Sequence, residues 1–82
     1  MIYYLFSVYD DVTEQFGAPV LHVNSASAIR WFTSLCEKEK NIKNDLRLFC
    51  LGEFDLNSGV INPSSIDLIT VGKDINLDSE VK

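Results

Sequence analysis

The stretch from Asp45 to Asp55, DLRLFCLGEFD, most constrains the fold because it is rich in leucine and aromatic residues and a turn signal follows at once. Alternation along an extended strand divides it into two faces. The even-numbered face is apolar and is expected to meet a helix: Leu46, Leu48, Cys50, Gly52 and Phe54. The odd-numbered face is mixed: Arg47, Phe49, Leu51 and Glu53. The sequence predicts a central strand that runs into a hairpin turn over residues 55–59, where Gly59 supplies a positive φ.

Gly52 interrupts this strand pattern. A glycine inside a strand permits either a bulge or the close approach of another backbone. We expect one of these at Gly52, the close approach being that of the helix.

Residues 2–9 form a second apolar segment of β-forming residues and predict the first strand. Tyr4, Phe6 and Val8 fall on one face, and Tyr3, Leu5, Ser7 and Tyr9 fall on the other. A strand that is apolar on both faces is typically central and covered on both sides. Phe16, at the end of the following polar connection, is expected to fold back onto the sheet.

A short strand over Pro19–Val23 and a helix over Ala26–Lys40 are expected next. Asn24 or Ser25 can accept a hydrogen bond from a first-turn amide and so begin the helix. The apolar stripe of this helix is Ala28, Ile29, Phe32, Leu35 and Cys36, with Trp31 at its edge. His22 has no neighbouring ligand or nucleophile in the sequence and is interpreted as an ordinary strand histidine.

The segment after the hairpin turn is interrupted by proline. Val60-Ile61 begins a return strand, Asn62-Pro63-Ser64-Ser65 is expected to break it, and Ile66–Val71 forms a last strand. A helical turn started by Ser64 or Ser65 is the competing interpretation. Residues 74–82 are polar and acidic and are expected to fray.

The element order predicts an α+β fold in residues 1–73: a small mixed β-sheet of four to five strands with one α-helix packed on one face, in the order β-β-α-β-β. A chain of 82 residues is one domain with a thin margin of stability. The helix leaves the other sheet face uncovered, and Tyr3, Leu5, Phe49 and Leu51 are expected there. Such a patch is too apolar to stay wet, so we expect a homodimer with Leu5, Phe49 and Leu51 in its interface.

Net charge is −5, which disfavours non-specific nucleic-acid binding. The charge is uneven, since residues 30–47 hold five basic and three acidic residues and the rest of the chain holds two and nine. Such asymmetry either marks an interaction face or reflects a solvated helix and loop.

Catalytic and ligand motifs are absent from the sequence. Four isolated glycines make no phosphate loop, and no serine stands in a Gly-x-Ser-x-Gly elbow. Glu53 and Asp55 are two apart on a strand, but the turn explains Asp55 without catalysis. Two cysteines and one histidine cannot complete a four-ligand zinc site. We expect no enzyme, no cofactor and no metal.

Cys36 and Cys50 lie in apolar surroundings and are expected to be reduced core thiols rather than a disulfide, which fits a cytoplasmic location. The N-terminus lacks a basic region before its apolar segment, and no apolar run approaches about 20 residues, so neither a signal peptide nor a membrane span is expected.

Two ordered blocks carry a family resemblance: YLFSVYD at residues 4–10 with Pro19, Asn24 and AIRWF at 28–32, then LFCLGEFD at 48–55 with GVI at 59–61. Together they resemble the small non-structural protein of gokushovirus-type Microviridae, which are single-stranded DNA phages. The match covers residues 3–72. It implies a viral protein of the host cytoplasm that acts in the late switch to single-stranded DNA synthesis and packaging, with DNA binding presumed. Arg30 and Gly52 match motif positions that have no established role.

Two functional hypotheses follow. In the first, a phage accessory protein in DNA replication and packaging contacts single-stranded DNA weakly, by aromatic stacking and local cations. Its residues would be Tyr3, Arg30, Trp31, Lys43, Arg47 and Phe49. In the second, a dimeric interaction module docks on a phage replication or capsid protein without touching DNA.

Overall fold

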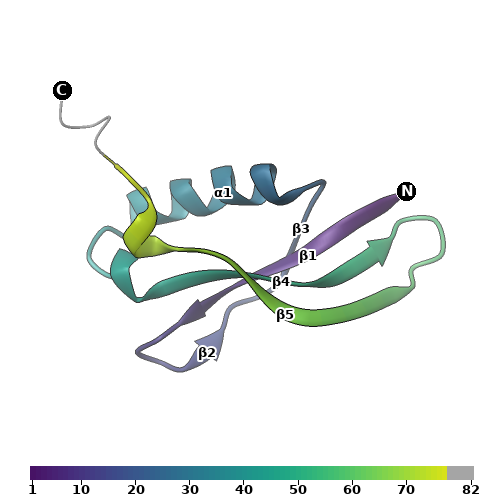
Figure 1. The fold of residues 1–82 in the computed structure, drawn as a ribbon, viewed down its shortest axis with the longest axis horizontal. Coiled ribbons are helices and arrows are strands. Elements are labelled where there is room, and N and C mark those ends of the chain that lie inside the picture. The colour runs from purple at the N-terminus through teal and green to yellow at the C-terminus, as the bar shows by residue number, and fades with distance from the viewer. Residues whose placement is uncertain (78–82) are drawn as a thin grey trace.

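The computed structural model describes residues 1–77, which form one helix, two 3₁₀ turns and five strands (Figure 1). The elements in chain order are β1 (Ile2–Asp10), β2 (Gln15–Phe16), β3 (Val20–His22), α1 (Ser25–Lys38), η1 (Lys43–Asp45), β4 (Leu46–Asp55), β5 (Ile61–Val71) and η2 (Gly72–Asp74). The strands make one sheet, and α1 lies across one of its faces (Figure 1).

The α+β class with one helix on a single sheet is confirmed, but the sheet is antiparallel throughout rather than mixed. Its order is β2-β1-β4-β5, and β3 also pairs with β1. β3 and β4 both run antiparallel to β1, on its two opposite edges, and are therefore parallel to each other without pairing. The crossover through α1 thus passes over β1, which explains why a β-α-β order here yields no parallel ladder.

β5 is one continuous strand, and the predicted break at residues 62–65 is wrong, as is the competing helical turn. Pro63 lies opposite Gly52, and β5 is the edge strand of the sheet. An edge strand tolerates proline because one of its sides needs no ladder hydrogen bond. Irregularities in the pairing with β4 absorb the additional residues of β5.

A bulge in β4 changes which face the end of the strand presents. Phe6 pairs with Cys50 but Leu5 pairs with Gly52, so Leu51 is an extra residue. Beyond it Glu53 pairs with Tyr4, and Phe54 pairs with Tyr3. The prediction that Phe54 faces the helix is therefore wrong, because a one-residue insertion reverses the facing of every later side chain.

Gly52 permits this bulge, and it does so against a different neighbour from the one expected. Its φ is 157°, and a Cβ at this position would collide with the backbone of Asn62 and lie 2.9 Å from Pro63 Cα. The close approach is made by β5, not by the helix.

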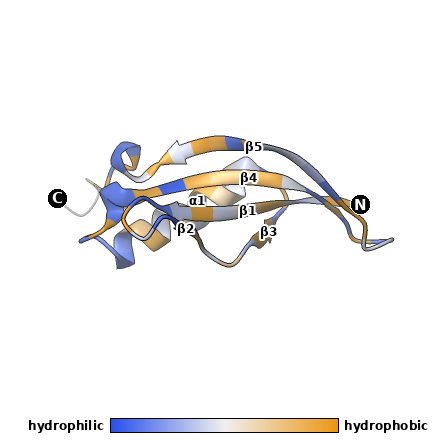
Figure 2. Cartoon of the chain, turned by 90° about the horizontal axis from the view of Figure 1, so that it is seen from below, coloured by the Kyte–Doolittle hydropathy of each residue, from blue (hydrophilic) through white to orange (hydrophobic). Residues whose placement is uncertain are grey.

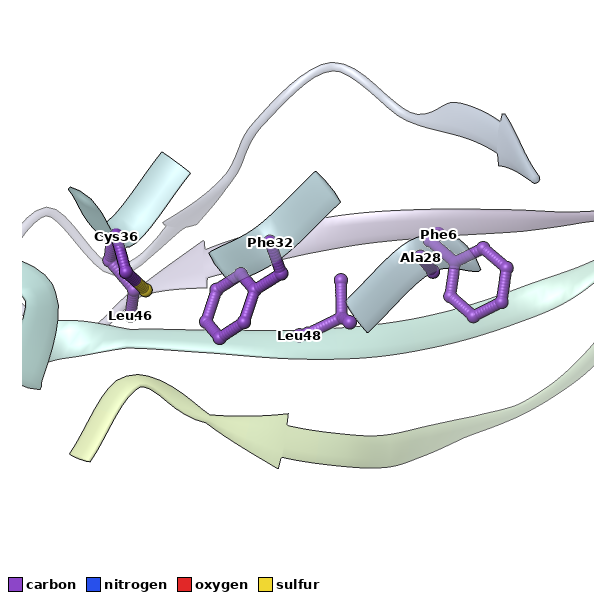
Figure 3. Packing of buried hydrophobic residues seen from close by; sticks show 6 residues of the cluster. All are labelled: Phe6, Ala28, Phe32, Cys36, Leu46 and Leu48. Carbon is purple, nitrogen blue, oxygen red and sulfur yellow. The ribbon is translucent and has the colours of Figure 1, made fainter. Parts of the chain in front are cut away.

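The core lies between α1 and the strands β1 and β4 (Figure 3). Its buried apolar members are Phe6, Ala28, Phe32, Cys36, Leu46 and Leu48. Tyr4, Val8, Cys50 and Ile69 pack against this cluster, which confirms the predicted inner faces of β1 and of the first half of β4.

The helix begins where the sequence indicates. The Asn24 side chain accepts a hydrogen bond of 2.8 Å from the Ser27 amide, and the helix ends at Lys38, two residues earlier than expected. At its first turn, His22 Nδ1 lies 3.1 Å from Ser27 Oγ and the His22 ring lies 5.6 Å from that of Trp31. These contacts give His22 a structural role that ties β3 to the helix.

Packing continues past residue 73, the expected domain boundary. η2 ends at Asp74, and Ile75 packs against the core. Residues 78–82 of the expected frayed tail lie outside the described part of the chain. No helix within residues 1–77 is long and apolar enough to cross a membrane.

Candidate interaction surface on the open sheet face

The sheet face opposite α1, here called the open face, is covered by no helix of the described chain (Figures 1 and 2). The strand pairings place its side chains. Leu5 lies opposite Leu21 on one edge of β1, Phe49 lies opposite Leu68 on β5, and Phe54 lies opposite Ile61. The apolar and aromatic side chains that the pairings place on the open face are Tyr3, Leu5, Tyr9, Phe16, Leu21, Phe49, Phe54, Ile61 and Leu68, and the bulged Leu51 lies among them in the sequence.

This composition is unusual for a solvated sheet face. An antiparallel sheet with one wet side normally alternates apolar residues inward and polar residues outward. Here Phe16, Leu21, Ile61 and Leu68 are exposed although they are large and apolar. Figure 2, drawn from this side, shows hydrophobic residues along the middle of β4 and hydrophilic residues at the end of the sheet where β4 begins.

Three aromatic rings form a cluster at one end of the open face. The Tyr9 and Phe16 ring centroids lie 4.9 Å apart, those of Phe16 and Phe49 lie 5.6 Å apart, and those of Tyr9 and Phe49 lie 6.4 Å apart. All three spacings fall within the range of favourable edge-to-face and tilted packing. The cluster therefore presents a preformed aromatic surface at the junction of β1, β2 and β4.

The centre of β1 contributes a polar residue that is fully satisfied. Ser7 is buried, and its hydroxyl donates a hydrogen bond of 2.7 Å to the carbonyl oxygen of Gly17. Gly17 in turn donates its amide to the Val8 carbonyl at 2.8 Å. These bonds hold the segment after β2 against the edge of β1, so Ser7 brings no unpaired polar group to the open face.

Arg47 is the basic residue of the open face, and it is neutralised. It lies opposite Tyr9, and its Nε lies 3.0 and 3.1 Å from the two carboxylate oxygens of Asp11. Other acidic side chains lie elsewhere: Glu53 and Asp67 line grooves with Tyr4 on the helix side. The open face is consequently close to neutral although the chain carries −5.

The six residues expected to contact nucleic acid occupy different parts of the molecule. Tyr3, Arg47 and Phe49 lie on the open face. Arg30 and Trp31 belong to α1 on the opposite side of the sheet, where Trp31 packs against the core. Lys43 lies in η1, at the end of the sheet where β4 begins. The fold places three of the six on one face, with Tyr3 toward the opposite end of β1 from Arg47, and it separates them from the two helical residues.

Two of the three residues expected in a dimer interface lie on the open face, and the third is the unpaired bulge residue of β4. Leu5 and Phe49 lie on the open face by their pairings, and Leu51, the bulged residue, lies between Gly52 and Cys50 on the same strand. Alternation along the sequence did not predict that Phe54 and Leu68 lie on the open face. The bulge reverses the facing of Phe54, and the facing of Leu68 depends on the irregular pairing of β5 with β4.

A cavity of about 370 Å³ opens on the helix side, at the start of α1. Its lining includes Tyr4, Cys50, Asp67 and Ile69. No group of three or more His, Cys, Asp or Glu side chains in residues 1–77 is arranged to hold a metal ion. The Cys50 thiol in this lining donates a hydrogen bond of 3.9 Å to the carbonyl oxygen of Gly52.

Within residues 1–77, Asp55 and Cys36 have shifted pKa values, and both shifts have structural causes. The Asn57 amide donates a hydrogen bond of 2.8 Å to Asp55 Oδ1 and lowers the pKa of that carboxyl. Burial raises the pKa of the Cys36 thiol. Cys36 and Cys50 are both free thiols, as expected.

Comparison with known proteins gives a family for the chain. The family model described as Phage ORF5 protein matches residues 3–75. No curated protein and no solved structure matches. The match confirms the part of the sequence resemblance that assigned the chain to a phage. It spans α1 and all of the sheet except the first residue of β1. The chain belongs to the Phage ORF5 protein family.

Proposed function

We propose that this phage protein is a non-structural accessory protein of a gokushovirus-type single-stranded DNA phage, which acts in viral DNA replication and packaging by binding protein through its open face. The family match supports a phage protein, and the motif blocks at residues 4–32 and 48–61 support the narrower assignment. The observation that carries the mode of action is the apolar open face. Four large apolar side chains from β2, β3 and β5 are exposed on this one face, and such grouping marks an interaction site.

Protein contact suits this face better than nucleic-acid contact. Nucleic-acid affinity comes largely from cations that replace the counterions of phosphates. The open face offers Arg47, which Asp11 already neutralises, within a chain of net charge −5. Apolar and aromatic groups are by contrast the residues that protein interfaces bury at their centres.

Leu68→Glu in the phage gene tests the proposal. Leu68 is 51% exposed, so the fold should survive, but a carboxylate would stand on the open face beside Phe49, the partner of Leu68 on β4. We expect duplex viral DNA to accumulate normally and packaged single-stranded DNA to fall by at least about tenfold, the change expected if binding weakens by about 1.4 kcal/mol.

Val60→Glu is the matched control for that experiment. Val60 is 50% exposed but lies in the β4–β5 turn, outside the open face. Normal yields of packaged DNA are expected from this variant. Normal yields from Leu68→Glu as well would refute the assignment of the open face to function.

A second candidate function is weak binding of single-stranded DNA, and the aromatic cluster favours it. Tyr9, Phe16 and Phe49 are preformed for stacking on bases, and Arg47 lies beside them. Fluorescence anisotropy of a labelled oligonucleotide at low salt is the test. Binding should weaken with added salt and be lost in Phe49→Ala. Absence of binding at low salt removes this candidate.

A further inference from the structure

We infer that the open face is covered by the open face of a second copy of this chain, which gives a symmetric dimer with the layers helix, sheet, sheet, helix. This inference rests on the proposed function for the assignment of the open face to protein contact, and it names the partner. Three properties of the described residues support it: the small core, the neutrality of the open face, and its area.

The core of a single copy is small. Six apolar residues are buried, all between α1 and two strands, and the molecule is only 16 Å across in its thinnest dimension. A chain of this size buries about 60% of the surface that its unfolded form exposes, and its stability is marginal. Stacking two sheets about 10 Å apart would create a second apolar layer from residues that are exposed to solvent in a single copy.

Charge favours a copy over a partner of opposite charge. Two chains of −5 repel each other unless their charges lie away from the contact. That condition is met, because Arg47 and Asp11 neutralise each other at one end of the open face while Glu53 and Asp67 line the helix-side grooves. A strongly basic partner would find no uncompensated carboxylate among the apolar residues of this face. Two copies of a neutral, apolar face can pack against each other without repulsion between their charges.

The area is sufficient for a stable pair. Strands β1, β4 and β5 contain 9, 10 and 11 residues, so at about 3.3 Å per residue they run for about 30 Å. Three strands about 4.8 Å apart, with their side chains, are roughly 20 Å wide. The footprint is therefore about 600 Å² per copy and about 1,200 Å² in total, at the lower end of specific stable interfaces.

A face-to-face pair also fits the symmetry of small oligomers. A two-fold axis through the open face makes the same patch serve both copies and closes the assembly at two. The aromatic cluster at one end and Phe54 and Ile61 toward the other would then be buried in both copies at once. The helix-side cavity at the start of α1 stays open, and it leaves each copy a second surface for other contacts.

The test is the solution mass by light scattering of the full chain and of three variants. The wild type should have twice the monomer mass of 9.3 kDa. Leu68→Glu and Ile61→Glu, at residues 51% and 57% exposed, should be folded monomers by circular dichroism. Val60→Glu, 50% exposed in the turn, should remain a dimer.

A monomeric wild type would overturn the inference. So would a dimer that survives both Leu68→Glu and Ile61→Glu, or an assembly larger than two. Should either variant unfold, hydrogen exchange of the open-face strands in the wild type decides the matter, measured above and below the protein concentration at which light scattering shows dissociation. Equal protection on both sides of that concentration refutes the dimer.

The same variants separate this inference from the proposed function. If the wild type is monomeric while Leu68→Glu still blocks packaging, the partner is another protein and the function stands. If Leu68→Glu breaks the dimer without any effect on the phage, the dimer stands and the function fails.

Discussion

At the scale of single residues, Gly52 shows how one position without a side chain sets the path of two strands. It follows the bulge in β4, and its φ of 157° lies in a region that other residues rarely adopt. The backbone of Asn62 and Pro63 in β5 occupies the space that a side chain would need. The bulge and the passage of β5 both depend on this glycine.

Gly52→Ala should therefore destabilise the protein by about 2–4 kcal/mol, from backbone strain and steric overlap together. Urea unfolding measures this change. Gly17→Ala is the matched control, since an added Cβ there would meet only the Val8 carbonyl oxygen at 3.7 Å, and we expect a change within about 0.5 kcal/mol. Equal effects of the two substitutions would contradict the close approach.

Asp55 gives a residue-scale prediction for pH. Its pKa is lowered in the folded state, chiefly by the Asn57 amide, from an ordinary value of 3.8. A lowered pKa means that the charged form stabilises the folded state, so this contribution is complete above pH 3.8 and is lost as pH falls through the lower folded value. The melting temperature of wild type should exceed that of Asp55→Asn at neutral pH, and the gap should close in acid. A gap that does not vary with pH would contradict this cause.

At the scale of elements, the helix cap and the strand order have different origins. Asn24 begins α1 through a local hydrogen bond to Ser27, three residues away. The sheet order depends on β1, which lies between β3 on one edge and β4 on the other. Local chemistry fixes the start of the helix, and pairing between distant segments fixes the sheet.

Asn24→Ala tests the local part. Loss of the cap should cost about 1 kcal/mol, which for a domain of this size lowers the melting temperature by about 4–8 °C. Asn24→Asp keeps an acceptor at the same place and should retain most of the stability. Thermal unfolding followed by circular dichroism measures both variants. An unchanged Asn24→Ala protein would show that tertiary packing alone holds the first turn.

At the scale of the whole molecule, the dependence on salt concentration distinguishes dimerisation through the open face from binding of single-stranded DNA. An apolar contact between two chains of −5 should persist or tighten as salt screens their repulsion. Binding to single-stranded DNA should weaken instead, because released counterions drive it. Sedimentation of the protein alone and anisotropy of a labelled oligonucleotide, each over a range of salt, measure the two trends. Dissociation of the pair by added salt would contradict an apolar interface.

The sequence alone predicted most of the elements, because their signals are local. The extent of β1, the cap at Asn24, the apolar stripe of α1 and the turn at Asp55–Gly59 were found within one or two residues. The inner faces of Phe6 and Leu48 also followed from alternation. The phage family followed from ordered motifs, with no catalytic residue to support it.

Only the tertiary structure decided the facing of Phe54, the continuity of β5 and the sheet order. A bulge inserts one residue without a distinct local signal, and it then reverses every later side chain. A proline interrupts a central strand but is tolerated in an edge strand such as β5, which contains Pro63. The sequence does not indicate which strand lies at the edge. The candidate surface has the same origin, because Phe16, Phe49 and Leu68 come from three separate strands and become one face only when those strands pair.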